Sequence, residues 1–231
     1  GGYGFLRVLL PLLPNASQEF AIYIIWLSVI AIIYASLVAL AQKDMKKMIA
    51  YSSIAHMGYV TIAIFSFTDI GVSGALFQML SHGIISSCLF LIVGTLYERL
   101  HTKEIAKYGG VASKMPLLAT FFMIAMLGSV GLPGTSGFIG EFLSLLGIYK
   151  VNVIATFLAA LGIILGAVYM LKLYKEVMLG EITNKEIINF RDLDSYEIIS
   201  IAPLILLIIY FGLMPSSILN VFHLSVENLL V

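Results

Sequence analysis

Three ionisable side chains, Glu141, His82 and His56, lie inside apolar stretches of this sequence. Burying a carboxylate or an imidazole in hydrocarbon is costly, so ionisable residues in membrane-spanning segments usually belong to functional sites. Carboxylates and imidazoles exchange protons when they lie within hydrogen-bond reach of each other, directly or through water. These residue types therefore predict lateral proton transfer within a membrane.

Glu141 comes just after a stretch that a regular helix cannot accommodate. Within seven residues this stretch contains Gly131, Pro133, Gly134 and Gly137. Proline removes a backbone donor and glycine raises the entropic cost of ordering, so the stretch predicts a broken helix. A break at membrane depth survives only where protein or water satisfies its backbone groups, and transporters place ion sites at such breaks.

The two histidines have polar neighbours at helical spacing. His82 recurs with Gln78 and Ser86 at every fourth residue, and His56 shares a helix face with Ser52 and Tyr59. The alternative is that both histidines only hydrogen-bond between helices as packing contacts. For Glu141 the alternative is an interfacial carboxylate reaching water.

Composition places these residues in a polytopic membrane protein. The chain has 231 residues, of which 60% are hydrophobic and 11% charged, with a net charge of zero and a mean hydropathy of +1.03. Successive apolar runs of about 20 residues are typical of bilayer-spanning helices. We expect an all-α fold with six full crossings, at about 20–41, 48–67, 72–97, 117–149, 153–174 and 197–213. The end of a preceding helix is expected at 1–14 and a surface tail at 215–231.

The broken helix at 117–149 is either a crossing or a re-entrant hairpin, because each half is too short to span alone. If it crosses, eleven of the thirteen Lys and Arg residues share one side of the membrane. The positive-inside tendency favours this crossing, with the loops after the first, third and fifth spans in the cytoplasm or mitochondrial matrix. Helical rise then places Glu141, His82 and His56 at about the middle of the bilayer.

Redox cofactors have no expected place in this chain. Cys88 is the single cysteine and lies in an apolar segment, and the sequence has neither a glycine-rich nucleotide fingerprint nor a metal-spaced histidine pair. We therefore expect no flavin, nicotinamide, iron-sulfur or other metal site here. Nothing indicates nucleic acid as a partner.

Three runs of the sequence resemble a known family. They are LVALAQKDMKKMIAYSSIAHMGYV (37–60), FQMLSHGIISSCLFLIVGTLYERLHTKEI (77–105) and GLPGTSGFIGEF (131–142). They are similar to the antiporter-like membrane subunits of respiratory complex I, the proton-translocating NADH-quinone oxidoreductase, and most of all to the chain 4 (chain M) type. Sister subunits generally carry lysine where this sequence has Glu141.

The resemblance implies an inverted five-helix repeat at 20–175, the second of two, followed by the last helix at 197–213. It assigns the outer half-channel to Glu141 and the central axis to His82 and His56, with proton affinities expected to change at His56, His82 and Glu141 in turn. It also implies that the first repeat precedes Gly1. Flavin and iron-sulfur clusters, with NADH and quinone as substrates, are then expected in partner subunits, in a bacterial plasma or mitochondrial inner membrane. The alternatives are a subunit of a multisubunit cation/proton antiporter, a subunit of a membrane-bound hydrogenase or formate-oxidising complex, and an inactive truncated remnant.

Overall fold

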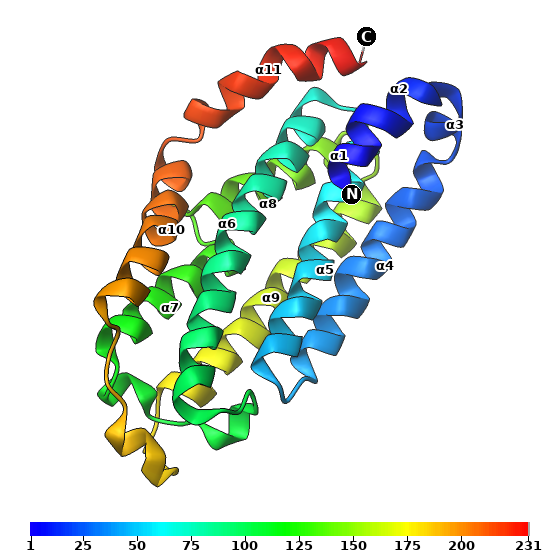
Figure 1. The fold of residues 1–231 in the computed structure, drawn as a ribbon. Coiled ribbons are helices and arrows are strands. Elements are labelled where there is room, and N and C mark those ends of the chain that lie inside the picture. The colour runs from blue at the N-terminus through cyan, green and yellow to red at the C-terminus, as the bar shows by residue number, and fades with distance from the viewer. Residues whose placement is uncertain (231) are drawn as a thin grey trace.

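The computed structural model describes residues 1–230, and helices dominate its regular structure there (Figure 1). The helices are α1 (Gly2–Gly4), α2 (Leu10–Leu12), α3 (Pro14–Glu19), α4 (Ala21–Leu40), α5 (Met45–Ile64), α6 (Asp69–Leu100), α7 (Pro116–Val130), α8 (Ser136–Tyr149), α9 (Val153–Met178), α10 (Ser195–Leu213) and α11 (Ser216–Leu230). A π-helical turn, η1 (Phe5–Leu9), joins α1 to α2, and short 3₁₀ turns occur at η2 (Ile105–Lys107), η3 (Val111–Ser113) and η4 (Lys185–Asn189).

Several helices begin two or three residues earlier than their apolar runs predict, because polar side chains cap them. The Asp44 carboxylate accepts a hydrogen bond from the Lys47 N–H at 3.0 Å, so α5 begins at Met45 rather than near residue 48. Thr68 caps α6 in the same way, accepting from the Gly71 N–H at 3.1 Å. Such caps satisfy backbone donors that the first helical turn leaves without partners.

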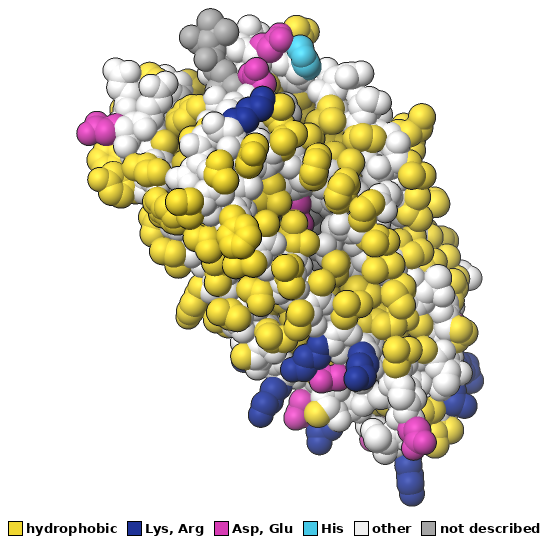
Figure 2. All heavy atoms as spheres, turned by 180° about the vertical axis from the view of Figure 1, so that it is seen from behind, with side chains coloured by type: hydrophobic (Ala, Val, Ile, Leu, Met, Phe, Trp, Pro, Cys, Tyr) yellow, Lys and Arg dark blue, Asp and Glu magenta, His cyan; other side chains and the backbone are white. Residues whose placement is uncertain are grey.

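Length and composition make four of the helices in residues 1–230 candidates for membrane spans: α4, α6, α9 and α10. Helix α5 is as long as α4, but it begins with two lysines and carries polar side chains along its length. Figure 2 shows apolar side chains over most of one face, with most of the visible Lys and Arg side chains at one end of the molecule. This arrangement confirms the all-helical membrane fold, and the basic end agrees with the charge distribution expected of a crossing.

Helices α7 and α8 follow each other along the whole length of α6. At the end of α6 that carries Arg99, α7 begins; at the other end, Gly147 of α8 packs against the backbone of Gly71. Between these points Gly128 of α7 lies against Ile85, in the middle of α6. The two half-helices therefore run antiparallel to α6 in series, as a crossing requires and a re-entrant hairpin does not.

Small residues bring α6 and α8 close together. A methyl group added at Gly74 would lie 2.6 Å from the Ser144 amide nitrogen, and one added at Gly140 would collide with the Gln78 side chain. Close approach of backbones through small residues is typical of helix packing in membranes. This contact presses the Glu141 face of α8 onto the polar stripe of α6.

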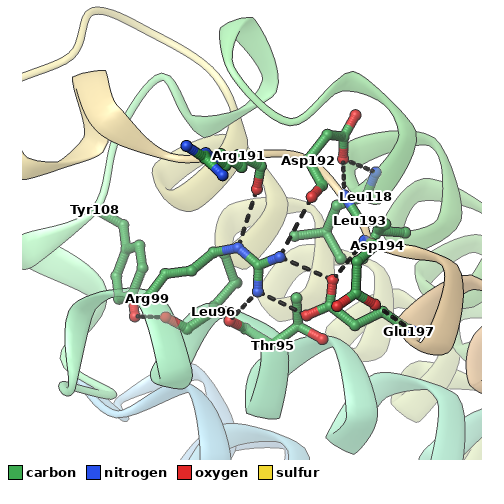
Figure 3. A network of polar contacts seen from close by, with 10 residues as sticks. All are labelled: Thr95, Leu96, Arg99, Tyr108, Leu118, Arg191, Asp192, Leu193, Asp194 and Glu197. Carbon is green, nitrogen blue, oxygen red and sulfur yellow. Dashed lines mark hydrogen bonds and ion pairs between the residues drawn. The ribbon is translucent and has the colours of Figure 1, made fainter.

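A polar network fastens α10 to the basic end of α6 (Figure 3). Arg99 donates to both carboxylate oxygens of Glu197, at 2.7 and 2.8 Å, and to the carbonyl oxygen of Arg191 at 3.0 Å. The Asp192 carboxylate accepts from the first free amides of α7, those of Leu117 at 2.8 Å and Leu118 at 3.2 Å. The loop before α10 is thereby held between the ends of α6 and α7.

Tyr108 closes the loop that follows α6. Its hydroxyl donates to the carbonyl oxygens of Thr102, at 2.8 Å, and Leu96, at 3.1 Å. Burial raises the pKa of this phenol, so it remains a hydroxyl donor throughout the physiological pH range.

The segment after Pro215, expected as a surface tail, forms helix α11. Figure 1 shows α11 crossing one end of the bundle towards α1 and α2. Val226 is buried in this contact, whereas Val221 and Leu224 are exposed. The segment is too short and too polar to span a bilayer, but its apolar residues recur at helical spacing. Residue 231, also part of the predicted tail, lies outside the described residues.

Candidate functional site

Glu141 and His56 form a buried pair. The Nδ1 atom of His56, on α5, lies 2.7 Å from Oε1 of Glu141, on α8. The two residues are 6% and 4% exposed, so neither reaches the lipid-facing surface. The alternative of an interfacial glutamate reaching water is therefore incompatible with the structure.

His82 joins this pair from α6. Its ring centre lies 5.2 Å from that of His56, and the ring planes are tilted by 42°. His82 is half-buried, whereas His56 is buried. The structure thus brings together all three ionisable residues that the sequence singles out. The expected order His56, His82, Glu141 is wrong, because His56 contacts both of the others and lies between His82 and Glu141.

Both ring nitrogens of His56 have partners. Nε2 lies 3.3 Å from Oγ of Ser129 on α7, and Nδ1 faces the Glu141 carboxylate. A neutral imidazole that donates from Nδ1 accepts at Nε2, and an imidazolium donates from both nitrogens. Because a serine hydroxyl both donates and accepts, Ser129 fits either state. The ring can thus receive a proton at one nitrogen and release one to Glu141 from the other.

The helix break lies beside Glu141, as predicted, and glycines make it possible. Helix α7 ends at Gly131, which has a left-handed φ of +76°, and Gly134 in the turn has a φ of +94°. L-residues with a side chain adopt such angles at an energetic cost. A methyl group at Gly131 would also lie 3.1 Å from Oε2 of Glu141. The missing side chain at Gly131 therefore leaves room for the carboxylate beside the break.

Gly137, the other glycine predicted at the break, allows α7 and α8 to pack closely. A side chain there would collide with the carbonyl group of Gly128, so α8 lies directly against the last turn of α7. Pro133 lies in the exposed part of the turn, between the end of α7 and the start of α8 at Ser136. Thr135, the residue before α8, has an extended backbone.

Two site residues were not assigned a role from the sequence. Gln78 donates from Nε2 to Oε1 of Glu141 at 3.4 Å. Ser129 contacts His56, and its only signal in the sequence is a polar residue two positions before the break. Conversely, Ser86 continues the predicted polar stripe but hydrogen-bonds the Gly83 carbonyl of its own helix. Of the three residues in the stripe, Gln78 and His82 therefore belong to the site and Ser86 does not.

Within residues 1–230, no group of three or more His, Cys, Asp or Glu side chains is arranged to hold a metal ion. Cys88 is buried in α6 with a free thiol.

The sequence of the chain is similar to those of known proteins. A family model described as "NADH:quinone oxidoreductase/Mrp antiporter, TM" matches residues 1–166. The chain is 96% identical to NADH-quinone oxidoreductase subunit M of Rickettsia bellii, over the whole of this chain and 47% of that protein. The chain therefore spans about half the length of the curated relatives it matches.

Solved structures share the fold. Respiratory complex I from Thermus thermophilus with bound NADH contains a chain that is 34% identical, with a TM-score of 0.94, covering 100% of this chain and 48% of that chain. The Mrp complex of Dietzia sp. contains a chain that is 19% identical, with a TM-score of 0.85, covering 92% of this chain and 48% of that chain. At 19% identity the second likeness concerns the fold alone.

Proposed function

Because the chain belongs to the NADH:quinone oxidoreductase/Mrp antiporter transmembrane family, we propose that it forms the C-terminal part of a proton-translocating membrane subunit of NADH-quinone oxidoreductase, complex I. The single observation that carries the proposal is the buried contact between His56 Nδ1 and Glu141 Oε1, at 2.7 Å. Ionisable groups held inside a membrane protein, beside a helix break, are typical of proton relays and ion sites in transporters.

The proposed path runs from His82 to His56 and then to Glu141. His82 is the half-buried member, and the 5.2 Å between ring centres leaves the two imidazoles within reach of each other through small ring movements or one water. His56 accepts one proton at Nε2 and releases another from Nδ1. Glu141 then releases the proton towards the outer side of the membrane.

Electron transfer takes place in partner subunits under this proposal. NADH, quinone, flavin and iron-sulfur clusters belong to those subunits, and quinone reduction changes the charge along the membrane arm. That change alters the proton affinities of His82, His56 and Glu141 in turn. The other partners are the neighbouring membrane-arm subunits and the preceding half of the same subunit, in a bacterial plasma or mitochondrial inner membrane.

The test replaces Glu141 by glutamine in the intact complex, which keeps the size of the side chain and removes its exchangeable charge. We expect the number of protons moved per NADH oxidised, measured in reconstituted vesicles, to fall. Glu181→Gln is the matched control, because Glu181 is an exposed loop residue. Unchanged pumping in Glu141→Gln would contradict the role of the buried pair, and sodium- or potassium-dependent proton exchange without NADH oxidation would indicate a cation/proton antiporter instead.

A further inference from the structure

At this site, the buried amide of Gln78 makes a hydrogen bond with only one of its two polar groups. It lies on α6, one turn before His82, and is 2% exposed. Its Nε2 donates to Oε1 of Glu141 at 3.4 Å. Its Oε1 is buried and has no hydrogen-bond partner among the described residues. A buried acceptor without a partner costs free energy, so this arrangement needs an explanation.

The surroundings of Gln78 hold its amide beside the carboxylate. Gly140, the residue before Glu141 on α8, packs so closely on Gln78 that a methyl group there would collide with the amide oxygen and lie 2.7 Å from the Gln78 Cα atom. Helix α8 therefore restricts the amide on this side. The amide can still turn about its last torsion, which exchanges the NH₂ group and the oxygen with little change of shape.

We propose that Gln78 is a positioning residue that responds to the protonation state of Glu141. When Glu141 is ionised, the carboxylate only accepts hydrogen bonds, and Gln78 holds it through Nε2. When Glu141 carries a proton, the carboxyl group has an O–H to donate, and the amide turns so that Oε1 accepts it. The atom without a partner in the first state is then the acceptor in the second.

This exchange would give Glu141 a partner in both of its states, so that neither state leaves the carboxyl group unsupported. The inference rests on the proposed function in one respect, that Glu141 gains and loses a proton. Other titratable side chains lie around the carboxyl group: His56 of α5 contacts it, Tyr59 of α5 and Tyr169 of α9 are near enough to interact with its charge, and His82 lies next to His56. The test must leave all four unchanged.

The experiment is infrared difference spectroscopy on the intact complex, comparing states with Glu141 protonated and ionised. The carboxyl band of Glu141 is identified by its loss in Glu141→Gln. We expect this band to change position in Gln78→Met, which keeps the length of the side chain and removes both hydrogen-bonding groups. The matched control is Ser144→Ala, because Ser144 is buried three residues beyond Glu141 but donates to the Gly140 carbonyl of its own helix, at 2.7 Å. There the band should not move.

A second measurement is made on the complex with Gln78 unchanged. With glutamine labelled by ¹³C in its side-chain carbonyl, one amide band should shift when Glu141 is protonated, and that shift should be missing in Glu141→Gln. If the carboxyl band is the same in wild type and Gln78→Met, or if no glutamine band follows Glu141, the inference is wrong. Neither measurement depends on proton pumping. A negative result in them contradicts the inference about Gln78, whereas unchanged pumping in Glu141→Gln contradicts the proposed function.

Discussion

Replacing Arg99 by glutamine removes the guanidinium that joins α6 to the loop before α10. In the structure Arg99 makes two charged hydrogen bonds to Glu197, at 2.7 and 2.8 Å, and the two side chains are 17% and 16% exposed. Hydrogen bonds between charged groups contribute about 1.5–3 kcal/mol each. Solvent screens part of the interaction between the two charged groups, so we assign each bond the lower end of that range, about 1.5 kcal/mol. The two bonds together then contribute about 3 kcal/mol. Opening of the loop should therefore become about 100-fold more frequent.

Tryptic cleavage after Arg191 in native membranes measures this opening. The Arg191 carbonyl accepts from Arg99 Nε, at 3.0 Å, so this part of the backbone must detach before a protease can bind it. When opening is fast relative to cleavage, the cleavage rate follows the open population, and we expect it to rise by about 100-fold in Arg99→Gln. Lys107→Gln is the matched control, because it removes one positive charge from an exposed side chain near this end of the bundle.

A double-mutant cycle separates the ion pair from the carbonyl contacts. If Arg99 acts through Glu197, the effects of Arg99→Gln and Glu197→Gln should fail to add, with a coupling of about 1–3 kcal/mol. The reasoning is refuted if Arg99→Gln is cleaved after Arg191 no faster than Lys107→Gln, or if the two substitutions add within about 0.5 kcal/mol.

Two glycine comparisons test the geometry around the site. Gly131→Ala and Gly134→Ala both force alanine into left-handed backbone, at a cost of about 1–2 kcal/mol each. Only the first also places a methyl group near the Glu141 carboxylate, so proton pumping should fall in Gly131→Ala and persist in Gly134→Ala; equal pumping in the two would contradict this. Gly140→Ala should lower the thermal stability of the complex because its methyl group collides with α6, whereas Gly166→Ala, whose nearest neighbouring atom would lie at 3.7 Å, should not; a loss as large in the second variant would refute the close-packing argument.

Much of the fold was predictable because each long apolar run must form its own helix in a membrane. The helix break between Gly131 and Gly137 followed from the conformational preferences of proline and glycine, and it is confirmed, since α7 stops at Val130 and α8 begins at Ser136. The predicted starts of α5 and α6 were late, because hydrophobicity does not include the polar residues Asp44 and Thr68 that cap them.

The contacts within the site were predictable only in part. Residue type and depth were enough to select Glu141, His82 and His56, because ionisable groups are rare in such segments. Their order depends on how α5, α6 and α8 are rotated, which follows from close packing at glycines such as Gly140 rather than from spacing along one helix. Ser129 was missed for the same reason, since a serine near a helix end has many possible partners.

Helix α10 packs over part of the helix break. Its Gly212 lies so close to the Gly134 carbonyl and to Thr135 that a methyl group there would collide with both. A gap in a backbone ladder is tolerable in hydrocarbon only when protein shields it. Much of the outer side of α10, including Ile199, Leu206 and Leu213, is exposed and apolar, so acyl chains meet this helix beside the part of the turn that stays exposed at Leu132 and Pro133. A helix that contributes no ionisable group to the cluster of His82, His56 and Glu141 thus shields part of the break beside that cluster, and the Arg99–Glu197 ion pair lies at its other end.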